Sequence, residues 1–231
     1  MKAAILSDIH ANLEALNAVL QDCEREGVDR FWLLGDYVDY GANPIEVVSR
    51  LAGLNAEYIV AGNHDACLYN SSVRHSVTPH GAQAFAYTKR IIGKNRGEFA
   101  FLETIINKPT VYLAKQKLLL AHGTPNDPYW GKFLPGAEND RMFADMERLD
   151  VRTLIIGHSH VGFLLQKGGR VIINPGSVGQ PRDGCPLAAY AILDQDSIVF
   201  RRVPYDIDGA SAAIKSAGLP EYLWQRLYYG M

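Results

Sequence analysis

The stretch Ala3-Ala4-Ile5-Leu6-Ser7-Asp8-Ile9-His10 places an apolar run directly before two side chains of the kinds that bind metals. A short apolar run of this type is typical of a buried strand. Asp8 and His10 are two residues apart, so both side chains can point the same way where the strand runs into a loop. The stretch therefore predicts a strand that ends in a pair of metal-binding side chains.

Four further segments repeat this arrangement along the chain. In each, an apolar run of the strand type comes just before a short polar segment. The runs are residues 31–34, 58–60, 118–121 and 154–156, and the polar segments are Gly35-Asp36, Gly62-Asn63-His64-Asp65, His122-Gly123 and Gly157-His158-Ser159-His160. Ligands at strand ends are held on rigid elements and face one rim of a sheet. We therefore expect all five segments to meet at one edge.

Length and composition indicate an ordinary globular protein. The 231 residues fit a single domain, 48% of them are hydrophobic, and a core of this size needs no disulfides. The cysteines Cys23, Cys67 and Cys185 are odd in number and far apart, which argues against a disulfide framework or a thiolate zinc site.

The net charge and the first residues indicate which binding partners and which cellular location to expect. The net charge is -2 and no basic stripe is present, so a nucleic-acid partner is disfavoured. Met1-Lys2 leads directly into the predicted strand, and no apolar run approaches the roughly 18 residues that a membrane span needs. We expect a cytoplasmic protein with a small-molecule partner and no membrane contact. The sequence leaves open whether the chain forms a homo-oligomer.

The order of predicted elements indicates a mixed α/β architecture. Strands and helices alternate over the first third as β-α-β-α-β, which favours a parallel sheet with right-handed crossovers. Residues 66–108 contain only helical patterns, at 79–92 and 97–106, and we expect a helical cap insertion that serves as a lid or as an oligomer surface. The rest contains paired strands at 111–114 and 117–121, a helix at 138–149, strands at 153–156, 161–166, 170–173, 187–193 and 197–203, and a helical tail at 207–227 interrupted at Gly218-Leu219-Pro220.

The polar segments offer more donors than one metal can use. Carboxylate, carboxamide and imidazole groups suit hard or borderline divalent cations. The seven donors are Asp8, His10, Asp36, Asn63, His122, His158 and His160. Such a set suits two metals bridged by one carboxylate, and two neighbouring cations activate a shared water for in-line displacement at phosphorus. We expect His64, which follows a ligand, either to protonate or to stabilise the leaving alkoxide, and Asp65 to orient an imidazole.

In their order and spacing, the five segments from Asp8 to His160 resemble the calcineurin-like metallophosphoesterase family, and in particular its small prokaryotic phosphodiesterase-type members. The resemblance implies a four-layer sandwich of two mixed sheets flanked by helices. It also implies that Asp8, His10, Asp36 and His160 hold one metal, that Asp36, Asn63, His122 and His158 hold the other, and that His64 is the catalytic imidazole.

A later loop, residues 174–182, is similar to one in the small prokaryotic members. Its glycines and prolines fit a tight turn that would bring backbone amides, and Arg182, near a phosphate, so Asn174, Ser177 and Arg182 are candidate substrate-binding residues. A phosphate contact and an ordinary surface role both remain open for Arg182. Asp39, Tyr37 and Tyr40 could edge the pocket or, for the aromatic residues, pack against the following helix.

Together these features predict a dinuclear metal-dependent phosphoesterase in which a metal-bridging hydroxide attacks phosphorus. Small phosphodiesters, nucleotides or dinucleoside polyphosphates are the expected substrates. Manganese, iron, zinc and nickel all remain open as the metal. The alternatives are a Ser/Thr phosphoprotein phosphatase and a non-catalytic protein-binding scaffold of the same fold, although a scaffold would be expected to have lost ligands.

Overall fold

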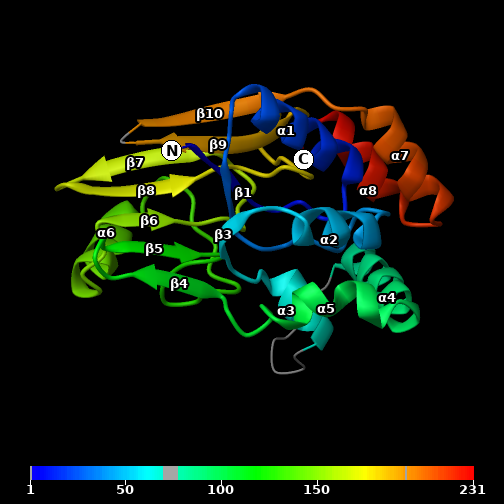
Figure 1. Ribbon diagram of the computed structural model, residues 1–231, viewed down its shortest axis with the longest axis horizontal. Helices are drawn as coiled ribbons and strands as arrows, with labels where there is room; N and C mark the ends of the chain where they lie inside the picture. The colour runs from blue at the N-terminus through cyan, green and yellow to red at the C-terminus, as the bar shows by residue number, and fades with distance from the viewer. Residues whose placement is uncertain (1, 70–77, 196) are drawn as a thin grey trace.

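A computed structural model describes residues 2–69, 78–195 and 197–231. In this part of the chain, ten strands form two five-stranded sheets that lie face to face, with helices outside them (Figure 1). No helix within the same ranges combines the length and the apolar character that a membrane crossing requires.

The first sheet has the order β10-β9-β1-β2-β3. Strands β1 (Lys2–Leu6), β2 (Arg30–Leu33) and β3 (Ala56–Ile59) are parallel, as the β-α-β-α-β rhythm predicts. They are joined through the helices α1 (Leu13–Arg25) and α2 (Pro44–Ala52). Strands β9 (Ala188–Asp194) and β10 (Ser197–Val203) add an antiparallel edge, with β9 paired to β1.

The second sheet has the order β4-β5-β6-β8-β7. Strands β5 (Leu118–Ala121), β6 (Thr153–Ile155) and β8 (Arg170–Asn174) are parallel to one another. Strands β4 (Thr110–Leu113) and β7 (Phe163–Lys167) pair antiparallel at the two edges. Helix α6 (Asn139–Arg148) connects β5 to β6.

Alternating side chains along the inner strands produce the four layers. In β1, Ala4 and Leu6 pack with α1 and α2, whereas Ala3 and Ile5 pack between the sheets. Strand β5 divides in the same way, because Leu118 and Leu120 face the first sheet while the alternate residues face α6. Because side chains alternate between the two faces of a sheet, each of these strands contributes to two hydrophobic cores. The predicted sandwich of two mixed sheets flanked by helices is confirmed.

The predicted helical insertion, residues 66–108, begins within α3 (Asn63–Tyr69) and contains α4 (Pro79–Lys94), a 3₁₀ turn η1 (Arg96–Phe99) and α5 (Ala100–Glu103). The helix predicted over 97–106 is therefore only a 3₁₀ turn followed by one helical turn. Phe99, Leu102 and Ile105 extend the core around α2. Residues 70–77, which belong to the predicted insertion, lie outside the described residues.

The chain ends in α7 (Ile207–Ser216), α8 (Glu221–Gln225) and a 3₁₀ turn η2 (Arg226–Tyr228). The break at Gly218-Leu219-Pro220 matches the predicted interruption, and Gly218 has a positive φ of 69°. The helices α7 and α8 pack as a small apolar cluster beside α1 and α4 (Figure 1).

Candidate metal centre

The five polar segments meet at the edge of the sandwich where the parallel strands end. Backbone hydrogen bonds join their loops, since the amide nitrogens of Asp8 and His10 donate to the backbone oxygens of Gly35 and Asp36 at 3.0 and 2.9 Å. Within the second sheet, the amide of Gly157 donates to the backbone oxygen of His122 at 2.9 Å, and across the two sheets the amide of His158 donates to Asp8 Oδ2 at 3.1 Å. The predicted convergence at one edge is therefore present in the structure.

Five of the seven predicted ligands have a left-handed backbone conformation. They are Asp8 (φ 53°), His10 (φ 50°), Asp36 (φ 54°), His158 (φ 62°) and His160 (φ 60°). Non-glycine residues rarely adopt this region, at a cost of about 1 kcal/mol or more each, and such residues concentrate at functional sites. The surrounding hydrogen bonds hold the loops in conformations that the side chains alone would not favour.

Two glycines let the loops after β2 and β3 approach closely. A Cβ at Gly35, whose φ is 90°, would lie 2.6 Å from the Cα of Gly62. A Cβ at Gly62 would collide with the carboxylate of Asp36. Small residues are therefore required at both positions to bring Asp36 and Asn63 side by side.

The first cluster contains Asp8, His10 and His160, and all three side chains are buried. The Nε2 atoms of His10 and His160 are 3.3 Å apart, and His160 Nε2 is 3.2 Å from Asp8 Oδ1. Burial raises the pKa of the Asp8 carboxyl to about 6, although the charge of His122 acts in the opposite direction. Burial also lowers the pKa of His10 and His160 well below 6.5, so both imidazoles are neutral.

The second cluster contains Asp36, His122 and His158, with Asn63 beside them. His122 Nε2 lies 3.2 Å from Asp36 Oδ2 and 3.1 Å from Asn63 Oδ1. Burial alone would lower the pKa of His122, but the charge of Asp36 and the contact with it raise that pKa to about 9. Burial, together with the nearby His122, lowers the pKa of His158 to about 3.

Asp36 lies between the two clusters. Its Oδ2 atom is 3.2 Å from His122 Nε2 and 3.6 Å from His10 Nε2. Burial alone would raise the pKa of Asp36, but the charges of His122, His64 and His10 hold it well below its usual range. An ionised carboxylate therefore faces both groups of donors.

The hydrogen bonds around the histidines fit two divalent cations. The Nδ1 atoms of His10, His122 and His160 lie 3.1, 2.7 and 2.6 Å from the backbone oxygens of Val38, Leu34 and Gln180. Since a backbone oxygen can only accept, each Nδ1 carries a hydrogen, and the neutral His10 and His160 each present an Nε2 lone pair toward the centre. Lone pairs that face one another at 3.3 Å repel unless a cation or a proton lies between them.

Two atoms without hydrogen-bond partners support the same conclusion. Asp8 Oδ1 and His158 Nδ1 are buried and have no hydrogen-bond partner. Buried polar atoms normally have partners, and a bound cation would supply one to both of these atoms. The residues present therefore fit a dinuclear metal site of the kind that the sequence predicts.

His64 is held beside this centre by Asp39. Its Nδ1 atom is 2.6 Å from Asp39 Oδ2, and its amide nitrogen donates to Asp36 Oδ1 at 2.9 Å. Burial alone would lower the pKa of His64, but the charge of Asp36, followed by Tyr40 and Asp39, raises it to about 10. The Tyr40 ring completes the surroundings, with its centroid 4.7 Å from the His64 and His10 rings.

The expected role of Asp65 is wrong. Its carboxylate accepts hydrogen bonds from the backbone amides of Asp36, Tyr37 and Gly62, at 2.7, 2.9 and 2.9 Å. It therefore ties the loop after β2 to the loop after β3 and orients no imidazole. Asp39, three residues after Asp36, contacts His64 instead.

The side chains of Asn174 and Ser177, two of the candidate substrate-binding residues, are fully buried and bonded within the protein. Asn174 Nδ2 donates to the backbone oxygen of Gly157 and to Ser159 Oγ. Ser177 Oγ donates to the backbone oxygen of Asp8 at 2.7 Å and accepts from the amide of Gln180. Both residues support the loops that carry the donors.

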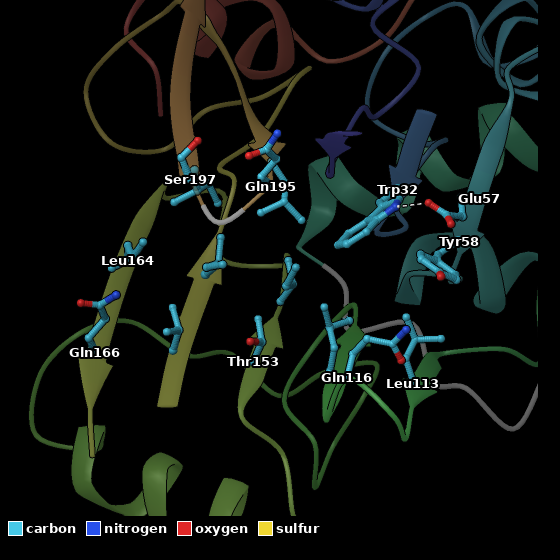
Figure 2. A pocket seen from close by; sticks show the side chains of 16 residues that line it. Trp32, Glu57, Tyr58, Leu113, Gln116, Thr153, Leu164, Gln166, Gln195 and Ser197 are labelled. Atoms are coloured by element: carbon cyan, nitrogen blue, oxygen red, sulfur yellow. Dashed lines mark hydrogen bonds between the residues drawn. The ribbon is translucent and has the colours of Figure 1, made fainter. Parts of the chain in front are cut away.

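One cavity lies away from this centre. It has a volume of about 500 Å³ and opens between the two sheets at the edge where the parallel strands begin, next to Leu118, Thr153 and Val171 (Figure 2). Its walls are mainly apolar, and the Trp32 indole in them donates to the Glu57 carboxylate at 3.0 Å. None of the predicted metal ligands lines it.

The chain is similar in sequence to a known protein family and to individual proteins. The chain matches the model of the calcineurin-like phosphoesterase superfamily domain over residues 1–197. An uncharacterized protein of Methanocaldococcus jannaschii is 36% identical over 246 aligned residues, which cover 98% of this chain and 97% of the relative. Phosphodiesterase YfcE of Escherichia coli strain K12 is 29% identical over 205 residues, which cover 85% and 89%.

A solved structure is similar to this chain in both fold and sequence. The crystal structure of a metallophosphoesterase from Sphaerobacter thermophilus is similar to this chain with a TM-score of 0.82 and 36% sequence identity. The match covers 100% of this chain and 99% of that one.

Proposed function

The chain belongs to the calcineurin-like phosphoesterase superfamily, a family of metal-dependent hydrolases, and on that premise we propose that it is a dinuclear phosphodiesterase acting on small molecules. The position of Asp36 carries this proposal. One carboxylate oxygen faces His10 on one side and His122 on the other. That is the arrangement expected of a group that bridges two cations.

We assign seven side chains to the two ions. Asp8, His10, Asp36 and His160 would hold one, while Asp36, Asn63, His122 and His158 would hold the other. When bound, two such cations lower the pKa of a water molecule and neutralise charge that gathers on a phosphoryl group. Manganese, iron, zinc and nickel all suit this mixture of imidazole, carboxylate and carboxamide donors.

His64 is the proposed proton donor to the leaving oxygen. Its Nδ1 is held 2.6 Å from Asp39 Oδ2, so Nε2 is the nitrogen that can pass a proton. The hydrogen bond from the His64 amide to Asp36 Oδ1 fixes the imidazole relative to the centre at 2.9 Å. An alkoxide that leaves a phosphodiester must take up a proton, and His64 would donate it.

Small phosphodiesters, nucleotides and dinucleoside polyphosphates remain the proposed substrates. The E. coli relative that is named a phosphodiesterase supports the ester class. The complete set of seven donors, together with His64, favours an enzyme over a binding scaffold. Nothing in the described part of the chain favours a phosphoprotein substrate over a small molecule.

The test is hydrolysis of bis-p-nitrophenyl phosphate and p-nitrophenyl phosphate by metal-stripped protein, with manganese, zinc, nickel or no metal added back. Turnover should require metal and should be faster with the diester. Asp36→Asn should abolish it, by at least about a thousandfold, because the bridge is lost. Asp140→Asn, on the exposed face of α6, is the matched control and should retain activity.

Elemental analysis distinguishes the possible failures. Absence of turnover with two ions bound per chain would overturn hydrolysis of these esters but leave the metal centre standing. Full activity in Asp36→Asn would overturn the bridging role.

A further inference from the structure

One of the seven predicted metal ligands is partly exposed. Six of them have at most 2% of their surface exposed, whereas His158 reaches solvent. Arg182, the remaining candidate of the 174–182 loop, is also partly exposed, and its amide nitrogen donates to the backbone oxygen of His160 at 3.1 Å. In the described part of the chain, the loop at 157–160 therefore marks the accessible side of the centre.

The Trp130 indole lies beside this accessible ligand. Its ring centroid is 6.2 Å from that of His158, and the two rings are nearly perpendicular, with an interplanar angle of 89°. The centroid of the His158 ring is in turn 5.1 Å from that of His122, which is fully buried. The three rings thus lead from the buried donors to the partly exposed indole, which borders the accessible side of the centre.

Hydrogen bonds hold the loop that carries Trp130. This loop follows strand β5 and closes on itself, because the amide of Gly123 donates to the backbone oxygen of Pro128 at 2.8 Å. The amide of Trp130 donates to Asp127 Oδ1 at 3.0 Å, and the amide of Gly131 donates to the backbone oxygen of Asp127 at 2.9 Å. The position of the indole is therefore fixed by the same loop that begins at a predicted ligand.

Core packing does not account for this indole. Among the residues that the structure describes, Trp130 is part of none of the hydrophobic clusters. The other two tryptophans, Trp32 and Trp224, each pack in one of these clusters, and so does Phe133, which is three residues further along the loop. A tryptophan held on a fixed loop, outside the core and beside an accessible ligand, suits contact with a bound molecule, because the indole offers a large rigid apolar face.

We propose that Trp130 forms an aromatic subsite that stacks the nucleobase of a nucleotide substrate while the phosphate of that substrate lies at the metal centre. The inference rests on the proposed function in that this phosphate is the one hydrolysed. Bases stack on aromatic side chains with little regard to their identity, since every base has a planar π-face. The substrate class narrows accordingly to nucleotide esters, with little preference among the bases.

The first experiment measures base binding with a product that the proposed reaction would release. Adenosine 5′-phosphate and ribose 5-phosphate, which lacks the base, are titrated calorimetrically into the metal-loaded protein. The wild type should bind adenosine 5′-phosphate about tenfold more tightly. Trp130→Ala should remove most of this difference, whereas Trp130→Phe should keep most of it because a phenyl ring also stacks. Equal affinities in the wild type, or an undiminished difference in Trp130→Ala, would overturn the subsite.

The matched control is Tyr112→Ala. Tyr112 is an exposed aromatic residue of β4, and its hydroxyl donates to the backbone oxygen of Asp150. This variant should bind both ligands as the wild type does. A loss of the base preference equal to that in Trp130→Ala would show that the effect is not specific to the indole and would overturn the assignment.

Tryptophan fluorescence identifies the ring that the base contacts. A base stacked on an indole quenches its emission, so adenosine 5′-phosphate should quench part of the wild-type emission and ribose 5-phosphate should not. Trp130→Phe still contains Trp32 and Trp224 and should bind adenosine 5′-phosphate without quenching. The same quenching in Trp130→Phe as in the wild type would overturn the contact with Trp130.

The second experiment tests the assignment during turnover. Thymidine 5′-(p-nitrophenyl phosphate) and its analogue without the base have the same leaving group. The wild type should show about a tenfold higher kcat/KM for the thymidine ester, mainly through KM, and Trp130→Ala should remove most of that preference with little change in kcat. An equal loss on both substrates would place the indole against the leaving group or the sugar and would overturn the assignment to the base.

The two experiments separate this inference from the proposed function. A base preference in binding that depends on Trp130, without turnover of any ester, would sustain the subsite and overturn the hydrolase proposal. Turnover of p-nitrophenyl esters without any base preference would do the reverse. Circular dichroism melts verify that each variant is folded, and Trp130→Phe with its fluorescence readout keeps the test decisive if Trp130→Ala does not fold.

Discussion

The two edges of the sandwich are built differently although the same strands run between them. Where the parallel strands end, polar loops are tied together by hydrogen bonds, and ligand positions have left-handed backbone conformations. Where the strands begin, the sheets separate around an apolar cavity of about 500 Å³, and glycines such as Gly168 and Gly169 form the turn between β7 and β8 (Figure 2).

The two edges therefore differ in what they contribute, because one carries the candidate metal centre and the other mainly stabilises the fold. The edge with the metal centre accepts conformational strain so that the donors converge, as functional sites commonly do. The opposite edge has no donor cluster in the described residues and contributes mainly apolar burial. Substitutions at the two edges should therefore affect different measurements.

The largest expected effect is that of His64→Ala at the metal edge. Turnover should fall by about 10²–10⁴-fold, because the leaving oxygen loses its proton donor. Both metals should stay bound, since the imidazole is placed outside the donor set. Steady-state kinetics and elemental analysis check the two parts. Loss of metal in this variant would show that His64 is a ligand.

At the opposite edge, Leu118→Ala should lower the free energy of unfolding by about 2 kcal/mol, the low end for such truncations, because Leu118 already faces a cavity. The expected kcat at 25 °C stays within about twofold of the wild type. Denaturant titration and kinetics on the same preparation test this. A large loss of kcat at unchanged stability would show that the two edges are coupled.

Asp39→Asn should have an intermediate effect at the metal edge. Loss of the charged partner of His64 is expected to reduce kcat about 10–100-fold, as for other residues that orient a functional imidazole. The matched test is a double-mutant cycle with His64→Ala. In that background Asp39→Asn should cause almost no further loss, whereas additive losses would contradict a role through His64.

The smallest expected effect concerns Asp22, on the last turns of α1. Burial alone would raise its pKa, but hydrogen bonds from Tyr190, Arg25 and Arg201 hold it below 3.8. Because the folded pKa is the lower one, the stabilisation is complete above about pH 5 and disappears as the pH falls through the folded pKa.

Asp22→Asn should therefore cost about 1 kcal/mol at pH 7, roughly 3 °C in Tm, and much less at pH 3. Melting curves of the two proteins across this range provide the check. A constant difference at all pH values would show that the charge of Asp22 is not what stabilises α1 against β10.

Local patterns were sufficient to predict the two packed sheets and the meeting of the five polar segments at one edge, because each polar segment follows its own apolar strand. The parallel strands bring their polar ends to one edge, so segments that lie far apart in the sequence are close together in the structure. The helix predicted over 97–106 failed because its apolar residues Phe99, Leu102 and Ile105 pack on α2 from a 3₁₀ turn and a single helical turn.

Contacts between distant segments were harder to predict. Asp65 and Asp39 are both close to ligands in sequence, and only the fold shows that Asp65 binds backbone amides while Asp39 reaches His64. The one local signal was the spacing of Asp39, three residues after Asp36.

The left-handed backbone at five predicted ligands also has a consequence for stability. Glycine adopts this conformation without strain, so replacing one of these ligands by glycine would relieve local strain while removing a donor. A chain that had no metal to bind could therefore gain stability at these positions, and the strain at the predicted ligands is a cost that only metal binding would offset.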